Sequence, residues 1–76
     1  MRCIVEEDIN VQFGRILRKL RETRGHTQEE FANLCGMSRA YYGKAELGKH
    51  SLTLEKCVAV AEATGLPLAE LFRDII

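Results

Sequence analysis

The sequence is poor in the residues that build sheets, membrane spans and disulfide frameworks. Its 76 residues include one proline and no tryptophan, and β-branched residues form no run, which favours helices over strands. No apolar stretch approaches the roughly 20 residues that cross a bilayer, and no signal-peptide pattern is present. We therefore expect an all-α protein of the cytoplasm that makes no contact with membranes.

Cysteine and histidine are also scarce, and their spacing supports no reactive site. The three cysteines, Cys3, Cys35 and Cys57, are odd in number and lack the paired spacing of a zinc site. Cys35 and Cys57 fall on apolar faces of expected helices, as small buried thiols do. His26 and His50 have no serine, cysteine or carboxylate at a catalytic spacing. We expect no enzyme activity, metal, cofactor or small-molecule ligand.

Net charge is absent, yet the charges are unevenly distributed. Between Phe13 and His50 eight cations stand against four anions, whereas residues 1–12 carry one cation and three anions, and residues 51–76 carry two and four. A basic middle with acidic ends is expected when one face of a protein meets phosphates. A mixed surface divided by chance is the alternative.

The stretch from Thr27 to Leu47 carries the clearest local pattern. Thr27 followed by Glu30 is a capping box that starts a helix at about Gln28. Gly36 permits a turn with positive φ, and Ser38 caps a second helix. A short helix, a glycine turn and another short helix are typical of the helix-turn-helix motif, here residues 28–47.

Apolar spacing predicts a helix before this motif, from about Asn10 to Arg24 and closed by Gly25. Its apolar residues recur at the interval of one helix face and are Phe13, Ile16, Leu17 and Leu20. Residues 1–9 are weakly patterned. They form either a loose arm or, through their apolar side chains, a segment packed onto the domain or a partner.

Two further helices are expected after the motif, which completes a single domain over residues 10–76. Thr53 caps the first, whose apolar face is predicted as Leu54, Cys57, Val58 and Ala61, and Gly65 ends it. Pro67 sits in the first turn of the last helix, where its missing amide costs nothing. One side of that helix carries Leu68, Leu71 and Phe72.

Two segments carry a resemblance to a known family, FGRILRKLRETRGHTQEEFANLCGMSRAYYGKAELGK and LTLEKCVAVAEATGLPLAELF. From Phe13 to Phe72 the chain resembles the Cro and C1 repressor type of helix-turn-helix family. The resemblance implies a compact five-helix, lambda-repressor-like domain. It also implies a transcription regulator that binds double-stranded DNA as a homodimer, with its third helix in the major groove of a palindromic operator. The LTLE loop resembles the corresponding loop of the restriction-modification controller subgroup. An antitoxin-like protein or a protein-interaction module with this fold is the alternative.

The resemblance implies two sets of DNA-contacting residues. The base-contacting set is Arg39, Ala40, Tyr41, Gly43 and Lys44, and the backbone-contacting set is Thr27, Gln28, Ser38, Lys49 and His50. Arg39 suits guanine O6 and N7, and the methyl of Ala40 suits a thymine methyl. For Gln28, Arg39 and Ala40, exposure to solvent alone is the alternative.

Other positions are expected to be structural. The family pairs Arg21 with Glu46, which links the first helix to the end of the third. Tyr42 is expected in the core with its hydroxyl at the edge, and Tyr41 exposed beside the DNA backbone. Three residues depart from the family pattern: Gly43, Ala45 and Leu47.

The last helix carries more apolar surface than one small core requires. A lone five-helix domain would leave several of these side chains partly exposed. The predicted dimer interface is therefore Leu68, Phe72, Ile75 and Ile76.

Overall fold

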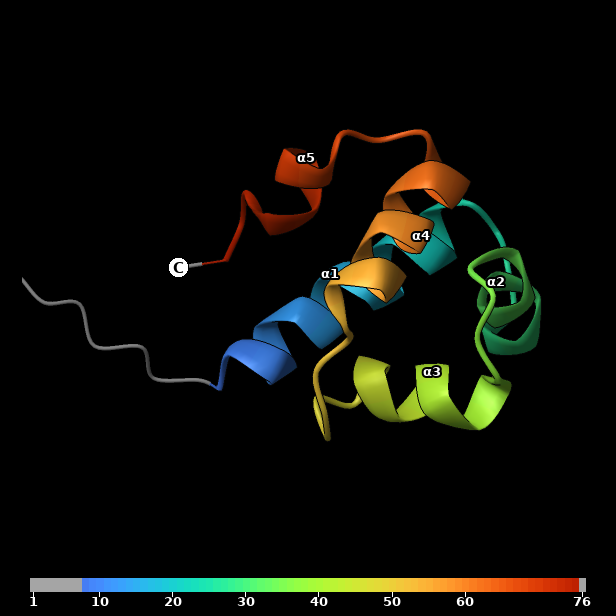
Figure 1. The fold of residues 1–76 in the computed structure, drawn as a ribbon. Coiled ribbons are helices and arrows are strands. Elements are labelled where there is room, and N and C mark those ends of the chain that lie inside the picture. The colour runs from blue at the N-terminus through green and yellow to red at the C-terminus, as the bar shows by residue number, and fades with distance from the viewer. Residues whose placement is uncertain (1–7, 76) are drawn as a thin grey trace, which may run out of the picture.

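The computed structural model describes residues 8–75. These residues contain five helices and no strand. They are α1 (Ile9–Thr23), α2 (Gln28–Leu34), α3 (Arg39–Glu46), α4 (Leu54–Thr64) and α5 (Leu68–Phe72). In Figure 1, α1 runs behind α4, while α2 and α3 lie on the side away from α5. The predicted all-α, five-helix fold is confirmed.

Side-chain caps start the helices where the sequence predicts them. The Thr27 hydroxyl accepts from the Glu30 amide at 3.1 Å, and the Glu30 carboxylate accepts from the Thr27 amide at 2.9 Å. Ser38 and Thr53 cap α3 and α4 in the same way. Each cap satisfies an amide that the helix itself leaves unpaired.

The start of α1 corrects one expectation. Asp8 is the N-cap, because its carboxylate accepts from the Asn10 amide at 2.7 Å, and the helix begins at Ile9. Residues 8 and 9 therefore belong to the helix and its cap rather than to an arm, since an aspartate at this place satisfies a free amide. Residues 1–7, which include Cys3 and the rest of the expected arm, lie outside the described residues.

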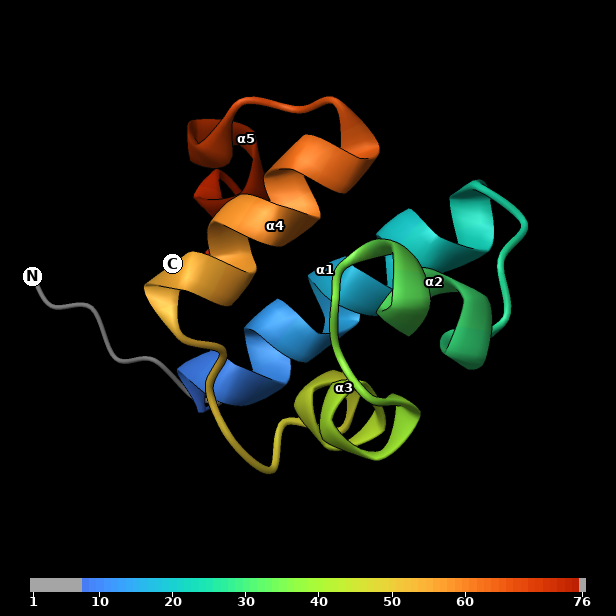
Figure 2. The same cartoon turned by 45° about the vertical axis from the view of Figure 1, so that its right-hand side comes forward.

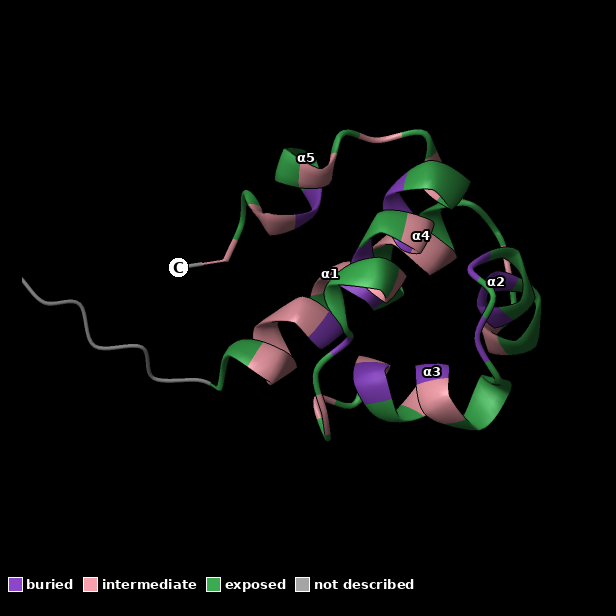
Figure 3. Cartoon of the chain, in the orientation of Figure 1, coloured by how far each residue is buried: buried purple, intermediate pink, exposed green. Residues whose placement is uncertain are grey.

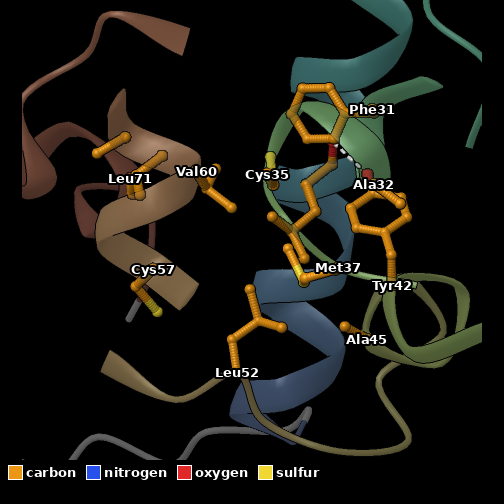
Figure 4. Close-up of a cluster of buried hydrophobic side chains, with 12 residues drawn as sticks. Phe31, Ala32, Cys35, Met37, Tyr42, Ala45, Leu52, Cys57, Val60 and Leu71 are labelled. Atoms are coloured by element: carbon orange, nitrogen blue, oxygen red, sulfur yellow. Dashed lines mark hydrogen bonds between the residues drawn. The ribbon is translucent and has the colours of Figure 1, made fainter. Parts of the chain in front are cut away.

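The core lies between the two halves of the fold. Figure 4 shows buried side chains of α2 and α3, including Phe31 and Tyr42, on one side and those of α4 and α5, including Val60 and Leu71, on the other. Leu17 of α1 is also fully buried. Cys35 is buried as expected, and burial raises the pKa of its thiol to about 11, so that it stays protonated at neutral pH.

The predicted apolar face of α4 is half right: Cys57 and Ala61 are buried as predicted, but Leu54 and Val58 are not. The buried residues of this helix are Cys57, Val60 and Ala61, whereas Leu54 is 76% exposed and Val58 is 41% exposed. Apolar residues surround most of α4, so two overlapping stripes have helical spacing and periodicity alone cannot choose between them. Packing against the core selects one stripe and leaves the other on the surface, as Figure 3 shows in green.

Helices α1 and α3 approach one another backbone to backbone. A Cβ atom on Gly14 of α1 would lie 2.3 Å from the Glu46 carbonyl oxygen and 2.8 Å from that of Ala45. Gly48, which follows α3 with φ of 79°, is equally confined, because a Cβ there would lie 2.7 Å from the Val11 Cα. In Figure 2, α3 lies next to α1 along this contact. Glycine is therefore required at position 14 for packing rather than for a turn.

Substituting Gly14 tests this contact. Gly14→Ala should lower the free energy of unfolding by about 1–3 kcal/mol, because the two backbones must separate to admit the methyl group. Gly43→Ala, in α3, is the matched control, since its Cβ would meet only the Gln28 Oε1 at 3.7 Å. It should stabilise the protein by up to about 1 kcal/mol through helix propensity. Urea denaturation of both variants measures the difference, and equal stabilities would contradict the proposed contact.

Candidate nucleic-acid interface

One side of α3 faces away from the rest of the protein. Arg39, Ala40 and Lys44 are exposed on this side and Gly43 is half-buried, whereas Tyr42 and Ala45 are buried. The spacing of the exposed residues is that of one helix face. In Figures 1 and 3, α3 lies along one edge of the molecule, with its buried positions turned toward the other helices. We call this side of α3 the outward face.

The outward face and the turn that follows it are cationic. Arg39, Lys44 and Lys49 are all exposed, and none of them has a carboxylate within ion-pair distance among residues 8–75. The one acidic residue of α3, Glu46, turns the other way, and its side chain is only 5% exposed. The outward face therefore presents positive charge without a neutralising anion, as a surface that meets phosphates does.

The carboxylate of Glu46 joins three helices on the inner side. Its Oε2 accepts from Arg21 Nε of α1 at 2.6 Å and from the Tyr42 hydroxyl at 2.5 Å. Its Oε1 accepts from Arg21 Nη2 at 3.3 Å and from Gln28 Nε2 of α2 at 3.0 Å. Arg21 also donates to the His26 carbonyl at 3.1 Å. We call these four side chains, Arg21, Gln28, Tyr42 and Glu46, the Glu46 network.

The Glu46 network shifts the pKa values of its ionisable members. Burial alone would raise the pKa of the Glu46 carboxyl, but hydrogen bonds from Arg21, Tyr42 and Gln28 together hold that pKa below its ordinary value of 4.5. The hydrogen bond to Glu46 raises the pKa of Arg21. Burial and the neighbouring carboxylate raise the pKa of Tyr42. At neutral pH the network holds an ion pair and a neutral phenol.

The two tyrosines and Gln28 lie differently from what the resemblance implied. Tyr42 is fully buried, so its hydroxyl serves the network rather than the edge of the protein. Tyr41 is half-buried rather than exposed, because its ring packs on that of His50 with centroids 4.5 Å apart. The Gln28 amide nitrogen donates to Glu46, which leaves one of its two hydrogens for any further partner.

The remaining predicted backbone-contacting residues border the outward face. The hydroxyls of Thr27 and Ser38 accept cap hydrogen bonds, and each keeps its own proton to donate. His50 Nδ1 lies 3.1 Å from the Ser51 carbonyl oxygen, and its Nε2 is buried without a partner in the described part of the chain. Ser38 and the turn at Lys49 and His50 thus lie at the two ends of α3, whereas Thr27 caps α2.

Sequence reasoning missed three contributions to the geometry of this surface. Gly14 brings α1 against α3, and Gln28 and Tyr42 complete the Glu46 network. A glycine inside a predicted helix costs about 1 kcal/mol relative to alanine, which is itself a signal of close packing. No sequence pattern indicates the other two, because the network joins residues far apart in the chain.

A second surface, away from α3, is apolar. A groove of about 350 Å³ is bordered by the start of α1, the start of α4 and the end of α5. Its apolar lining residues include Ile9, Phe13, Leu54, Phe72 and Ile75. Two of the predicted interface residues, Phe72 and Ile75, line this groove, and Leu68 does not; both Leu68 and Phe72 also pack against the core. Ile76 lies outside the described residues. We call this surface the apolar groove.

Residues 8–75 contain no cluster of three histidine, cysteine or carboxylate side chains that could hold a metal. Within that range no helix has the length and apolar character to cross a membrane.

The short helix α2, the glycine turn and α3 with its outward face together define a helix-turn-helix protein. A sequence profile described as Helix-turn-helix (HTH_3) matches residues 17–71. The chain therefore belongs to the helix-turn-helix family.

Curated and solved relatives agree with this assignment. The chain is similar to the control protein C.MunI of Mycoplasma sp, with 38% identity over 69 residues that span 90% of this chain and 93% of that protein. It is also similar to the crystal structure of the restriction-modification controller protein C.AhdI from Aeromonas hydrophila, with a TM-score of 0.79, 38% identity and coverage of 83% and 96%. The clp gene regulator ClgR from Corynebacterium glutamicum superposes with a TM-score of 0.83 at 26% identity, over 91% of this chain and 73% of ClgR.

Removing the Glu46 charge tests the network. Glu46→Gln should lower the free energy of unfolding at pH 7 by about 3 kcal/mol, because Arg21 loses its buried partner. The folded pKa of Glu46 lies below 4.5, so the wild-type protein has the full benefit above that pH and loses it as the pH falls further. The difference between wild type and variant should therefore shrink from pH 5 to pH 3.

Chemical denaturation at pH 7, 5 and 3 measures this change. The control is Glu70→Gln, since Glu70 forms an exposed pair with Arg73 at 3.2 Å, has no contact with Arg21 and should contribute little at any pH. A stability difference for Glu46→Gln that stays constant across this range would show that the carboxylate is not the titrating group.

Proposed function

We propose that this protein is a sequence-specific transcription regulator that binds double-stranded DNA as a homodimer and places α3 in the major groove of each half-site. The observation that carries the proposal is the outward face, where Arg39 and Lys44 are exposed and unpaired within residues 8–75 while Glu46 is neutralised inside. An α-helix fits the major groove, and phosphates supply the anions that this surface lacks.

Reading of bases is assigned to the N-terminal half of α3. Arg39 in the first turn can donate two hydrogen bonds to guanine O6 and N7, and Ala40 offers a methyl to thymine. Gly43 lets the helix backbone approach the base edges, and Lys44 lies one turn further along the same face. Tyr41, packed on His50, stands at the border between base edges and backbone.

Positioning on the DNA backbone is assigned to the residues that border the outward face. The hydroxyls of Thr27 and Ser38 lie at the starts of α2 and α3 with a proton to donate. Lys49 follows α3 with an exposed ammonium group, and Gln28 retains one amide hydrogen. His50 contributes only through its main chain, because its Nε2 is buried and its Nδ1 lies 3.1 Å from the Ser51 carbonyl oxygen. Such contacts fix the register of a protein on a duplex without reading its sequence.

The homodimer is assigned to the apolar groove. Leu54 and Val58 are exposed on α4 beside the groove, and Ile9 is exposed at the start of α1. A continuous apolar surface on so small a protein is typical of an interface. Two copies related by a two-fold axis would present their α3 helices to half-sites about one helical turn of DNA apart.

The names of the relatives suggest a narrower role. C.AhdI is called a restriction-modification controller protein and C.MunI a control protein. Because each of these alignments covers more than four fifths of both chains, we assign this protein to the same controller type. In this role, dimerisation makes DNA binding depend on the concentration of the protein.

Selection of bound DNA from a random duplex pool tests the proposed function. The wild-type protein should enrich a palindromic sequence, and its affinity should fall steeply as salt rises. Arg39→Ala should weaken binding by about 1–3 kcal/mol and relax the preference at one guanine position in each half-site. Lys19→Ala, at an exposed cation of α1 that lies beside α5, should change neither property. Failure of the wild-type protein to enrich any sequence would refute the proposal.

The proposed interface is tested separately by a charge on α4. Leu54→Asp should convert the dimer to a monomer with little loss of fold stability, because this side chain lies on the surface of the protomer. Leu34→Asp, at an exposed leucine of α2, is the matched control and should leave the dimer intact. Sedimentation equilibrium reports both, and a Leu54→Asp protein that remains a dimer would place the interface elsewhere.

A further inference from the structure

Leu47 extends the outward face beyond the end of α3. It is the C-cap residue, its backbone keeps a helical conformation, and its side chain is 67% exposed. Leu47 follows Ala40 by seven residues, which is nearly two full turns of a helix with about 3.6 residues per turn. It therefore points in nearly the same direction as Ala40, and it lies one turn beyond Gly43 and Lys44.

The chemistry of Leu47 differs from that of its neighbours. Lys44 and Lys49 on either side of it are exposed cations that suit the acceptor oxygens and nitrogens of DNA. Leucine cannot donate a hydrogen bond to a phosphate, so it suits an apolar group instead. DNA offers two such groups near a docked helix, the 5-methyl of thymine in the major groove and the carbon face of a deoxyribose.

Exposure alone would carry no inference, since single exposed leucines are common. Leu47 differs from the other exposed leucines, Leu34 and Leu54, in the surface on which it lies. Leu34 is exposed on α2, and Leu54 lines the apolar groove, whereas Leu47 lies on the face that DNA covers if α3 enters the major groove. Docking of α3 would therefore remove the Leu47 side chain from water, which favours binding.

We propose that Leu47 is a further DNA-contacting residue, which adds affinity by apolar contact with a thymine methyl or a deoxyribose of the operator. This proposal rests on the proposed function and deepens it. It assigns the end of the outward face to apolar contact, and not to phosphate binding.

Substitution of Leu47 separates apolar contact from phosphate contact. On the palindromic operator enriched from the random pool, Leu47→Ala should bind roughly 25-fold more weakly than the wild type, about fivefold for each half-site, because the apolar contact is lost in both. Its dependence on salt should be unchanged, since no phosphate contact is lost. Leu47→Lys should instead make the dependence on salt steeper, by about two units of slope, one for the new lysine–phosphate pair in each half-site. Leu34→Ala is the matched control and should bind as the wild type does.

A second arm identifies the apolar group on the DNA. Each thymine of the operator is replaced by uracil, which removes only the methyl group. If Leu47 contacts a thymine, one replacement should weaken wild-type binding by about fourfold, the value of one buried methyl, and should not weaken Leu47→Ala further. If it contacts a deoxyribose, wild type and Leu47→Ala should respond alike to every replacement, while Leu47→Ala remains the weaker binder.

The outcomes distinguish the two levels of the proposal. Wild-type and Leu47→Ala proteins that bind the operator equally would overturn the assignment of Leu47 and leave the proposed function standing. A wild-type protein that binds no duplex at all would overturn both. Circular dichroism and thermal unfolding of each variant show whether an altered affinity reflects a loss of fold.

Discussion

The carboxylate of Glu46 is the interaction on which the arrangement of α1, α2 and α3 depends. It accepts four hydrogen bonds, from Arg21 of α1, Gln28 of α2 and Tyr42 of its own helix. A charge with so little access to water is tolerated only when its partners satisfy it. Those partners come from three helices, so the network defines one mutual placement of these helices and excludes others. Because the network holds the inner side of α3 against α1 and α2, the outward face of α3 stays in solvent.

The two sides of α3 thus differ in charge. Its one carboxylate is neutralised on the inner side, while Arg39 and Lys44 stand on the outer side in water. The backbone contact at Gly14 holds the inner side directly against α1. The apolar groove is bordered by other elements, the ends of α1, α4 and α5. Proposed DNA binding and proposed dimerisation therefore use different surfaces of one small core, and each can be altered without the other.

Much of the helical framework could be predicted because it depends on local interactions. The caps at Thr27, Ser38 and Thr53 and the turn at Gly36 involve residues within four positions of one another. The site could be predicted less completely. The cations of α3 are visible in the sequence, but the burial of Tyr42 and the stacking of Tyr41 on His50 depend on segments that meet only in the folded protein. For α4, where two apolar stripes are available, the local pattern identified Cys57 and Ala61 but included the exposed Leu54 and Val58 and omitted the buried Val60.

The sequence by itself determined the number, order and limits of the helices from α2 onward, because caps and glycines act within a single turn of chain. Only the tertiary structure decided which faces these helices bury and which they expose. It turned Glu46 inward to Arg21, left Leu54 and Val58 on the surface, and placed Leu47 in line with Ala40 and Lys44. The physical reason is that burial depends on the neighbours a side chain meets, and those neighbours come from distant parts of the chain.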